Sequence, residues 1–307
     1  NVLLGFKNGP AGLIEDKFIV FEDEYIDQFR NTGGFDIIGS GRTKLETEAQ
    51  FEVAAEVCKK HGITAIVIIG GDDSNTNAAV LAEYFAAHNT GVQVIGCPKT
   101  IDGDLKNDDI ECSFGFDTAI TIATEAIDRL HSTASSHQRV IVIEVMGHKA
   151  GWIALHSGMA GGGDIILIPE LEYNIRNIGN TIIERLKKGK TYSIVVVAEG
   201  IKKPDGKKAA EYIAQEIEYE TGFETRETVL GYIQRGGAPT AFDRNLATRM
   251  GGYATEMIAT GQFGRMVALQ GDKIGSIPLE DVAGKLKLVN EDHDLIVQGK
   301  RMGVCFG

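Results

Sequence analysis

Short apolar runs rich in β-branched residues alternate with amphipathic stretches along most of the chain. The apolar runs predict strands at 63–69, 92–95, 140–145, 165–168, 194–198, 229–233 and 266–269. Apolar residues at helical spacing predict helices between them, at 77–87, 118–131, 175–187, 209–221 and 241–260. This order of strand and helix indicates an α/β fold with mostly parallel sheets covered by helices on both faces. Burial on both faces also explains why the runs lack polar alternation.

Glycines and charged residues follow several of these runs, at the edge where such sheets bind ligands. The segment GGDDS at 70–74 comes directly after the first run. Its glycines let a phosphate approach the backbone, and the next helix offers free N–H groups and a positive dipole end. Two adjacent carboxylates are unusual at such a turn unless one of them holds a cation. The other interpretation is a plain strand-to-helix turn with Ser74 as the N-cap.

The segment PKTIDGD at 98–104 follows the next run. Phosphoryl transfer needs a base that orients the attacking hydroxyl, magnesium that neutralises charge, and a cation on the transferring group. This segment offers two carboxylates, a hydroxyl and a lysine within seven residues. A polar surface loop is the alternative interpretation.

Three later segments carry similar chemistry at predicted strand ends. They are MGHKAGW at 146–152, AEG at 198–200, and TR at 225–226 with LGYIQRGG at 230–237. A carboxylate at a strand tip can bind sugar hydroxyls, and the two arginines that bracket the predicted strand 229–233 suit a sugar phosphate. Arg139 and Arg42 are further candidates. Taken singly, the histidine of MGHKAGW is more typical of a capping or core residue, AEG of an ordinary strand-to-loop turn, and Arg139 and Arg42 of surface salt bridges.

Composition and motif searches exclude several classes of protein. A formal net charge of −12 disfavours nucleic acid and anionic membranes as partners. Thirty-eight glycines, against about 21 at average usage, fit the many turns of an α/β enzyme. The four scattered cysteines indicate reduced thiols in a cytosolic protein, and no apolar run reaches the roughly 18–20 residues of a membrane span. GKT at 189–191 lacks the earlier glycine of a phosphate-binding loop, and no dinucleotide fingerprint or nucleophile elbow occurs.

Taken in order, GGDDS, PKTIDGD, SSHQR, MGHKAGW, AEG, and ETR with LGYIQRGG resemble the phosphofructokinase family. The resemblance implies two similar Rossmann-like three-layer α/β domains with the active site in the cleft between them. It implies a phosphoryl-donor domain at 1–115 plus about 236–285, and a fructose 6-phosphate domain at 116–235 plus about 286–307. The implied reaction is the glycolytic, cytoplasmic, Mg²⁺-dependent phosphorylation of fructose 6-phosphate at its 1-hydroxyl to fructose 1,6-bisphosphate. The implied assembly is a homodimer or homotetramer.

The resemblance also assigns roles to matching residues. Asp102 matches the catalytic base, while Asp72 and Asp104 match carboxylates that work with magnesium, Asp72 as its ligand. Arg226 and Arg235 match a clamp on the 6-phosphate, with Arg139 reaching in from a neighbouring subunit. The remaining catalytic positions are Thr100 and Lys99; the remaining sugar-side positions are Met146, Gly147, His148, Glu199 and Tyr232; the donor-side positions are Gly71, Asp73, Ser74 and Arg42.

Two residues bear on the phosphoryl donor. The ATP-using branch has glycine in place of Asp73 and commonly glycine in place of Lys99, so this chain resembles the pyrophosphate-using branch. A carboxylate at Asp73 is expected to repel the α-phosphate of ATP, by about 4 kcal/mol at ~4 Å and an effective dielectric near 20. Lys99 is expected to hold the released phosphate.

Two alternatives remain open, an ATP-dependent 6-phosphofructokinase and a non-catalytic sugar-phosphate-binding subunit. The second is disfavoured because Asp102 and Asp104 are both present. His148 replaces the family's usual arginine, and Tyr232 stands where many relatives have histidine. The family's opening strand and glycine-rich turn have no counterpart here, so we expect an incomplete chain.

Overall fold

The computed structural model describes residues 2–29, 37–105 and 113–307, and the chain divides into two compact units. Unit 1 contains Asn1–Thr100, Leu105–Phe114 and Ala238–Leu286, and unit 2 contains Ile101–Asp104, Gly115–Gly237 and Lys287–Gly307. The boundaries expected from the sequence lie near those of the two units. They differ for residues 101–104, which were expected in the donor domain and belong to unit 2. Each unit is described separately below.

Unit 1 is built around a sheet with strand order β11-β10-β4-β3, in which β5 (Phe114–Gly115) also pairs with β4. The strands β3 (Ala65–Gly70), β4 (Gln93–Thr100) and β10 (Arg265–Gln270) are parallel, and β11 (Lys273–Pro278) is antiparallel to β10. A separate antiparallel pair joins β1 (Leu3–Phe6) to β2 (Phe18–Phe21). The helices of the unit are α1 (Pro10–Ile14), α2 (Asp23–Asp27), α3 (Glu48–His61), α4 (Asp72–Ala87), α9 (Ala241–Thr260) and α10 (Leu279–Val282).

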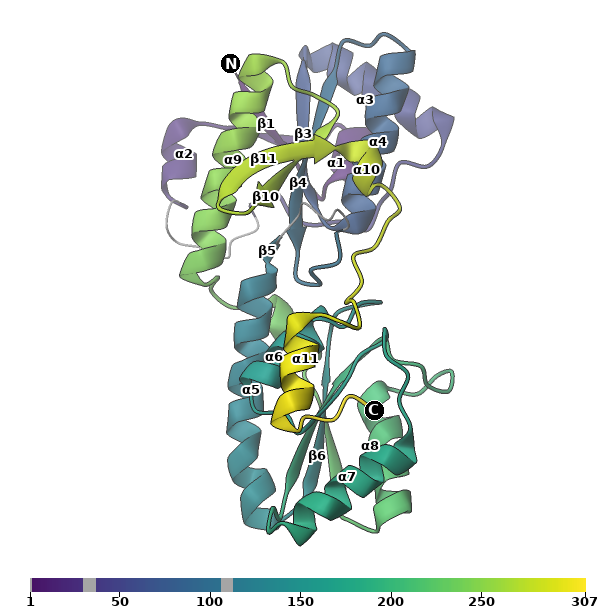
Figure 1. The fold of residues 1–307 in the computed structure, drawn as a ribbon. Coiled ribbons are helices and arrows are strands. Elements are labelled where there is room, and N and C mark those ends of the chain that lie inside the picture. Colours follow the sequence, from purple (N-terminus) through teal and green to yellow (C-terminus); the bar gives the residue numbers. More distant parts are fainter. Residues whose placement is uncertain (1, 30–36, 106–112) are drawn as a thin grey trace. The chain divides into compact units, whose positions relative to one another are not determined.

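The strands β4 and β10 bury side chains on both faces of this sheet, since successive side chains of a strand point to opposite faces, whereas Val67 and Ile69 of β3 are exposed. Val94 and Met266 belong to the core beside α3, α4 and α10, whereas Ile95 and Val267 belong to the core beside α9. Figure 1 shows α9 and the α3–α4 pair on opposite sides of the strands. For β4 and β10, burial on both faces confirms the explanation given above for the unbroken apolar runs; it does not hold for β3, where Val67 is 37% and Ile69 56% exposed.

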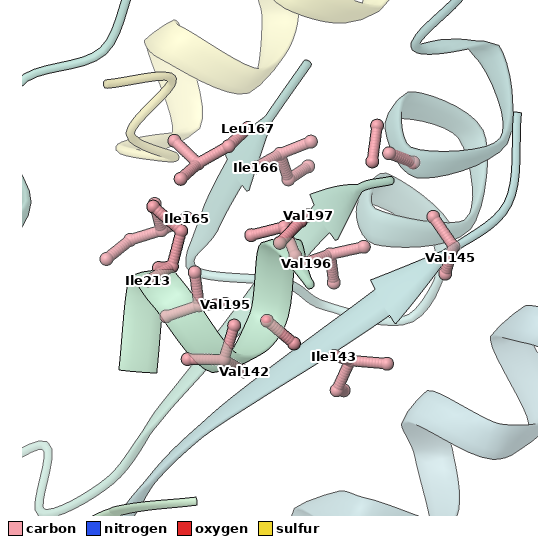
Figure 2. Packing of buried hydrophobic residues seen from close by; sticks show 14 of the residues in the cluster. Val142, Ile143, Val145, Ile165, Ile166, Leu167, Val195, Val196, Val197 and Ile213 are labelled. Carbon is pink, nitrogen blue, oxygen red and sulfur yellow. The ribbon is translucent and has the colours of Figure 1, made fainter. Parts of the chain in front are cut away.

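Unit 2 holds a fully parallel sheet of strand order β7-β8-β6-β9, made of β6 (Val140–Val145), β7 (Ile165–Leu167), β8 (Ser193–Ala198) and β9 (Thr225–Val229). The helices α5 (Phe116–His137), α6 (Trp152–Ala160) and α11 (Asp294–Met302) pack together on one face. The helices α7 (Ile175–Lys187) and α8 (Ala209–Thr221) cover the other. Figure 2 shows Ile213 of α8 beside Ile165 and Val195, within a layer of branched side chains. The predicted α/β fold with mostly parallel sheets is confirmed.

One predicted strand is wrong. Residues 229–233 do not form a strand, because Gly231 adopts a φ of 54° and begins the 3-10 helix η1 (Gly231–Arg235). The strand at this place is β9, which ends at Val229. Within the described sheet β9 pairs only with β6, and this edge position allows it to carry the polar sequence TRETV.

Cys58, Cys97 and Cys305 are free thiols, and Cys112 lies outside the described residues. Burial raises the pKa of Cys58 to about 11 and that of Cys97 to about 12, so both are inert core thiols. No helix in the described ranges is long and apolar enough to cross a membrane.

Candidate active site

The first candidate turn joins β3 to α4 in unit 1. The strand ends at Gly70, Gly71 is the N-cap of α4, and Asp72 and Asp73 lie in the first helical turn. The interpretation with Ser74 as the N-cap is wrong, because Ser74 lies inside the helix. The fully buried Asn75 donates from Nδ2 to the carbonyl oxygens of Gly70 (2.8 Å) and Gly71 (2.9 Å). These bonds fix the turn ahead of a helix N-terminus, where anions bind.

A second segment of unit 1 is pinned to the same helix. Asn77 of α4 donates from Nδ2 to the carbonyl oxygen of Leu45 (2.8 Å) and accepts at Oδ1 from the Leu45 N–H (3.1 Å). Beside this contact, Lys44 Nζ donates to Asp73 Oδ1 at 2.8 Å. That hydrogen bond raises the pKa of Lys44, which therefore stays charged. Arg42 is exposed two residues earlier, so two cations precede the buried Leu45.

The end of β4 lies at the same edge of the sheet as this turn. Gly70 pairs with Pro98 in the parallel register of β3 and β4. A Cβ on Gly71 would lie 3.4 Å from Cβ of Thr100, so the two segments are in near contact. Lys99 is exposed. The structure therefore brings six predicted residues together, namely Gly71, Asp72, Asp73, Ser74, Lys99 and Thr100.

The carboxylates of Asp102 and Asp104 lie in unit 2, in the turn of residues 101–104. Gly103 has a φ of 68°, a conformation that favours glycine. Asp104 is buried, at 4% exposure, and Asp102 is half-buried. The turn thus follows directly along the chain from Lys99 and Thr100.

The predicted sugar-side residues of unit 2 form one group at the carboxyl edge of its sheet. Glu199, which follows β8, accepts at Oε1 from the backbone N–H of His148, which follows β6 (2.8 Å). Gln234 of η1 is buried and accepts at Oε1 from the Met146 N–H (3.2 Å). Arg235 follows in sequence, with its guanidinium carbon 5.7 Å from the centre of the Tyr232 ring. Met146, Gly147, His148, Glu199, Tyr232 and Arg235 therefore belong to one edge of this sheet.

Arg139 and Arg226 lie at the opposite edge of that sheet. Arg139 precedes β6, and Arg226 pairs with Ile141 near the start of the same strand. Both arginines contact Glu224, Arg139 from Nε at 2.8 Å and Arg226 from Nη2 at 2.5 Å. These contacts, that with Arg139 foremost, lower the pKa of Glu224.

This arrangement corrects the expected clamp of Arg226 and Arg235 on one phosphate. Met146 lies five residue steps beyond Ile141 along β6, which at about 3.3 Å per step amounts to roughly 16 Å. Arg226 also turns toward Glu224, at the amino edge. Within one chain, Arg226 and Arg235 therefore do not grip the same phosphate.

Comparison with known proteins identifies the family. A family model described as phosphofructokinase matches residues 2–258. The chain belongs to the phosphofructokinase family. A curated relative from Bacteroides thetaiotaomicron, ATP-dependent 6-phosphofructokinase 3, is 61% identical over 99% of this chain and 90% of its own length. A relative from Streptomyces coelicolor, pyrophosphate--fructose 6-phosphate 1-phosphotransferase, is 41% identical over 99% of this chain and 90% of its own length.

Solved structures give the same family. The pyrophosphate-dependent phosphofructokinase of Nitrosospira multiformis matches with a TM-score of 0.86 and 26% identity, over 95% of this chain and 78% of that one. The phosphofructokinase of Pichia pastoris in its T-state matches with a TM-score of 0.83 and 29% identity, over 92% of this chain and 32% of that one. The chain is an enzyme of the 6-phosphofructokinase type, and the expected family resemblance is confirmed.

A magnesium ion suits the donor turn of this phosphofructokinase. Magnesium keeps several waters and is held by one or two carboxylates together with substrate phosphates. Asp72 supplies a half-buried carboxylate in the first turn of α4, next to backbone N–H groups that suit phosphate. No cluster of three or more acidic, histidine or cysteine side chains occurs among the described residues, and a site shared with substrate phosphates needs none.

Sequence reasoning missed three residues whose contacts shape the candidate site. Asn75 fixes the Gly70–Gly71 turn, Lys44 pairs with Asp73, and Gln234 holds Met146. Gln234 lies inside the LGYIQRGG segment, and Asn75 directly follows GGDDS. Their places in or beside these segments could therefore have indicated both residues. Lys44 is 29 residues from Asp73, and nothing in the local pattern indicates their contact.

Proposed function

We propose that the chain is a magnesium-dependent, cytoplasmic 6-phosphofructokinase of glycolysis that phosphorylates the 1-hydroxyl of fructose 6-phosphate, with pyrophosphate as donor. The observation that carries this proposal is the edge of the unit 1 sheet, where the N-terminus of α4 meets Lys99 and Thr100. From there the chain runs directly into the Asp102 and Asp104 turn. Anion binding, cations and a candidate base thus follow one another along the backbone.

The donor half of the proposed site belongs to unit 1. The first N–H groups of a helix have no acceptor within it, so the N-terminus of α4 suits the donor phosphates. Lys99 would hold the transferred group and the released phosphate, with Ser74, Thr100 and Arg42 as further contacts. Magnesium held by Asp72 would supply neutralisation of charge on the donor oxygens.

The acceptor half belongs to unit 2. Asp102 would accept the proton of the 1-hydroxyl, and the buried Asp104 would help to align the reactants. Glu199 would bind sugar hydroxyls beside Met146, Gly147 and His148. Arg235 would bind the 6-phosphate, with Tyr232 next to it.

We assign Arg139 and Arg226 to the site of a second copy of the chain. They share Glu224 at the amino edge of the sheet, far from Met146 and Glu199 of the same chain. Arg226 therefore belongs with Arg139, which the family resemblance assigns to a neighbouring subunit. This assignment requires a homodimer or a homotetramer.

Asp73 and Lys99 support pyrophosphate as the donor, although the repulsion between Asp73 and the α-phosphate of ATP is smaller than the sequence analysis expects. The Asp73 side chain is 74% exposed and paired with Lys44. In water, two unit charges 4 Å apart interact by only about 1 kcal/mol, roughly fivefold in affinity. The proposal therefore relies on the Asp73–Lys44 pair occupying the space that the α-phosphate of ATP would need.

ATP is the second candidate donor. The relative from Bacteroides thetaiotaomicron that is named ATP-dependent is 61% identical to this chain, more than the 41% of the Streptomyces coelicolor pyrophosphate enzyme. The Lys44 partner also reduces the repulsion that Asp73 exerts on a third phosphate.

Phosphorus-31 NMR on the purified chain tests the reaction. We expect fructose 6-phosphate, Mg²⁺ and pyrophosphate to give fructose 1,6-bisphosphate and orthophosphate, and the reverse mixture to give pyrophosphate. Product formed only with ATP would contradict pyrophosphate as the donor, but would still support phosphorylation of fructose 6-phosphate. No fructose 1,6-bisphosphate from either donor would contradict the proposed reaction.

A further inference from the structure

A short segment near the C-terminus contacts the turn that carries the proposed base. We call residues 287–289 the linker and residues 101–104 the base turn. The backbone N–H of Lys287 donates to the carbonyl oxygen of Asp104 at 2.7 Å. The carbonyl oxygen of Lys287 accepts from Nε1 of Trp152 at 2.8 Å. One residue of the linker thus joins the base turn to the first residue of α6.

Glu170 anchors the other end of the linker. Its Oε1 accepts from the backbone N–H of Val289 at 3.0 Å and from that of Gly151 at 2.9 Å. Val289 is buried, at 3% exposure. A Cβ on Gly151 would lie 2.7 Å from Oε2 of Glu170, so the close approach requires glycine. A single carboxylate oxygen therefore connects the linker to the segment that carries Met146 and His148.

The base turn also packs directly on two aromatic side chains of unit 2. A Cβ on Gly103 would lie 3.0 Å from a ring carbon of Phe116 and 3.6 Å from Cβ of Trp152. The ring centre of Trp152 is 6.2 Å from that of His156 and 5.3 Å from that of His293. The Trp152 ring thus lies beside two histidine rings, and its Nε1–H donates to the carbonyl oxygen of Lys287.

We propose that Trp152 and Glu170 are positioning residues, which hold the base turn through the linker in the geometry for proton transfer. The inference rests on the proposed function, in which Asp102 is the base. A base must meet the attacking hydroxyl within a fraction of an ångström, and a displacement of about 1 Å can cost roughly 10²-fold in rate. Trp152 and Glu170 act on Asp102 through the contacts of Lys287 and Val289, and Cβ of Trp152 also lies next to Gly103 of the base turn.

Two substitutions test the contacts separately. Trp152→Phe keeps the Cβ that faces Gly103 and an aromatic ring beyond it, but removes the Nε1–H donor, so kcat is expected to fall about tenfold. KM for fructose 6-phosphate should stay within about twofold, because Trp152 binds no substrate. Glu170→Ala should act in the same way, whereas Glu170→Gln keeps an acceptor oxygen and should restore most of the turnover. Equal losses in the Ala and Gln variants would overturn the role given to Glu170.

A double-substitution cycle separates positioning from a general effect on folding. If Trp152 acts through the base, Trp152→Phe should lower kcat in the wild type but hardly further in Asp102→Asn. The same tenfold loss in both backgrounds would overturn the inference, because Trp152 would then act independently of Asp102.

Amide hydrogen exchange gives a readout that needs no turnover. Exchange in the peptide covering residues 100–104 should be faster in Trp152→Phe and in Glu170→Ala than in the wild type. Tyr192→Phe is a matched control in the same unit, since it removes the hydroxyl contact to His131 (3.2 Å), away from the linker. Unchanged exchange of this peptide in both Trp152→Phe and Glu170→Ala would overturn the inference. An inactive wild type would instead contradict the proposed function, and the exchange would still decide whether the linker holds the turn.

Discussion

Lys44 and Asp73 form an ion pair in unit 1, with 2.8 Å between Nζ and Oδ1. The pair lies at the first turn of α4, beside the strand end that carries Lys99 and Thr100. The Lys44 cation thus lies next to the carboxylate of Asp73, which the sequence analysis expects to repel the α-phosphate of ATP. We therefore propose that donor choice depends on both side chains of this pair rather than on the charge of Asp73 alone.

The first prediction concerns this pair. Asp73→Gly should shift the ratio of kcat/KM for pyrophosphate over ATP toward ATP by about fivefold to tenfold, since it removes one exposed charge and the space it fills. Steady-state rates with both donors measure the ratio. Asp205→Gly, in an exposed loop of unit 2, is a matched control that should leave the ratio unchanged. A ratio that stays constant in Asp73→Gly would remove Asp73 from donor selection.

The second prediction concerns the base. Asp102→Ser should lower kcat by roughly 10²–10⁴-fold, because no other group of the turn takes the proton of the attacking hydroxyl in the proposed reaction. KM for fructose 6-phosphate should change little, since Asp102 does not bind the phosphate. Asp205→Ser serves as the matched control. Near-normal turnover of Asp102→Ser would exclude Asp102 as the base.

The third prediction uses the separation of Arg226 from Arg235. Each Arg→Ala variant should weaken fructose 6-phosphate binding by about 1.5–3 kcal/mol, the range of a charge-assisted hydrogen bond. A hybrid oligomer of Arg226→Ala and Arg235→Ala subunits should regain activity. One of its shared sites then combines an intact Arg235 with an intact Arg226 from the neighbour. A purified hybrid as weak as its parents would show that each chain uses its own two arginines.

The fourth prediction concerns stability toward acid. Burial, with smaller contributions from the charges of His293 and Lys287, lowers the pKa of His156 to about 4 from its ordinary 6.5. In the unfolded chain the His156 imidazole therefore binds a proton below about pH 6.5, whereas in the folded chain it binds one only near pH 4. Folding stability should fall as the pH drops through this window, by up to about 3 kcal/mol.

Urea unfolding at pH 7.5 and at pH 5 checks this dependence. His156→Gln has no proton to take up, so its free energy of unfolding should depend less on pH than that of the wild type. His148→Gln, which changes an exposed histidine, should retain the wild-type dependence. Equal pH dependence in wild type and His156→Gln would contradict the assignment.

Much of the fold follows from hydrophobic pattern. The ranges predicted for α7, α8 and α9 agree with the structure, because each helix has a clear apolar stripe and clear ends. The missed α3 carries a capping box at Thr47 and Gln50, a signal that was present in the sequence. The error at 229–233 has a physical cause, since apolar residues after an edge strand can belong to a turn. There Gly231 permits the positive φ.

The site was predictable where it follows strand order and not where it depends on distant contacts. Residues after β3, β4, β6 and β8 were found because parallel strands end at a common edge. The separation of Arg139 and Arg226 from Met146 was also encoded, since Arg139 directly precedes β6 and Arg226 lies at the start of β9, whereas Met146 follows the end of β6. The contacts of Lys44 with Asp73 and of Trp152 with Lys287 span 29 and 135 residues, and no local pattern reports them.

The most direct test is the initial rate of fructose 1,6-bisphosphate formation by the wild-type chain, with Mg²⁺ and fructose 6-phosphate saturating and the donor varied. The account predicts a higher kcat/KM for pyrophosphate than for ATP, and a rate with either donor that falls by roughly 10²–10⁴-fold in Asp102→Ser. A higher kcat/KM for ATP would contradict pyrophosphate as the donor, and no product with either donor would contradict the phosphoryl transfer itself.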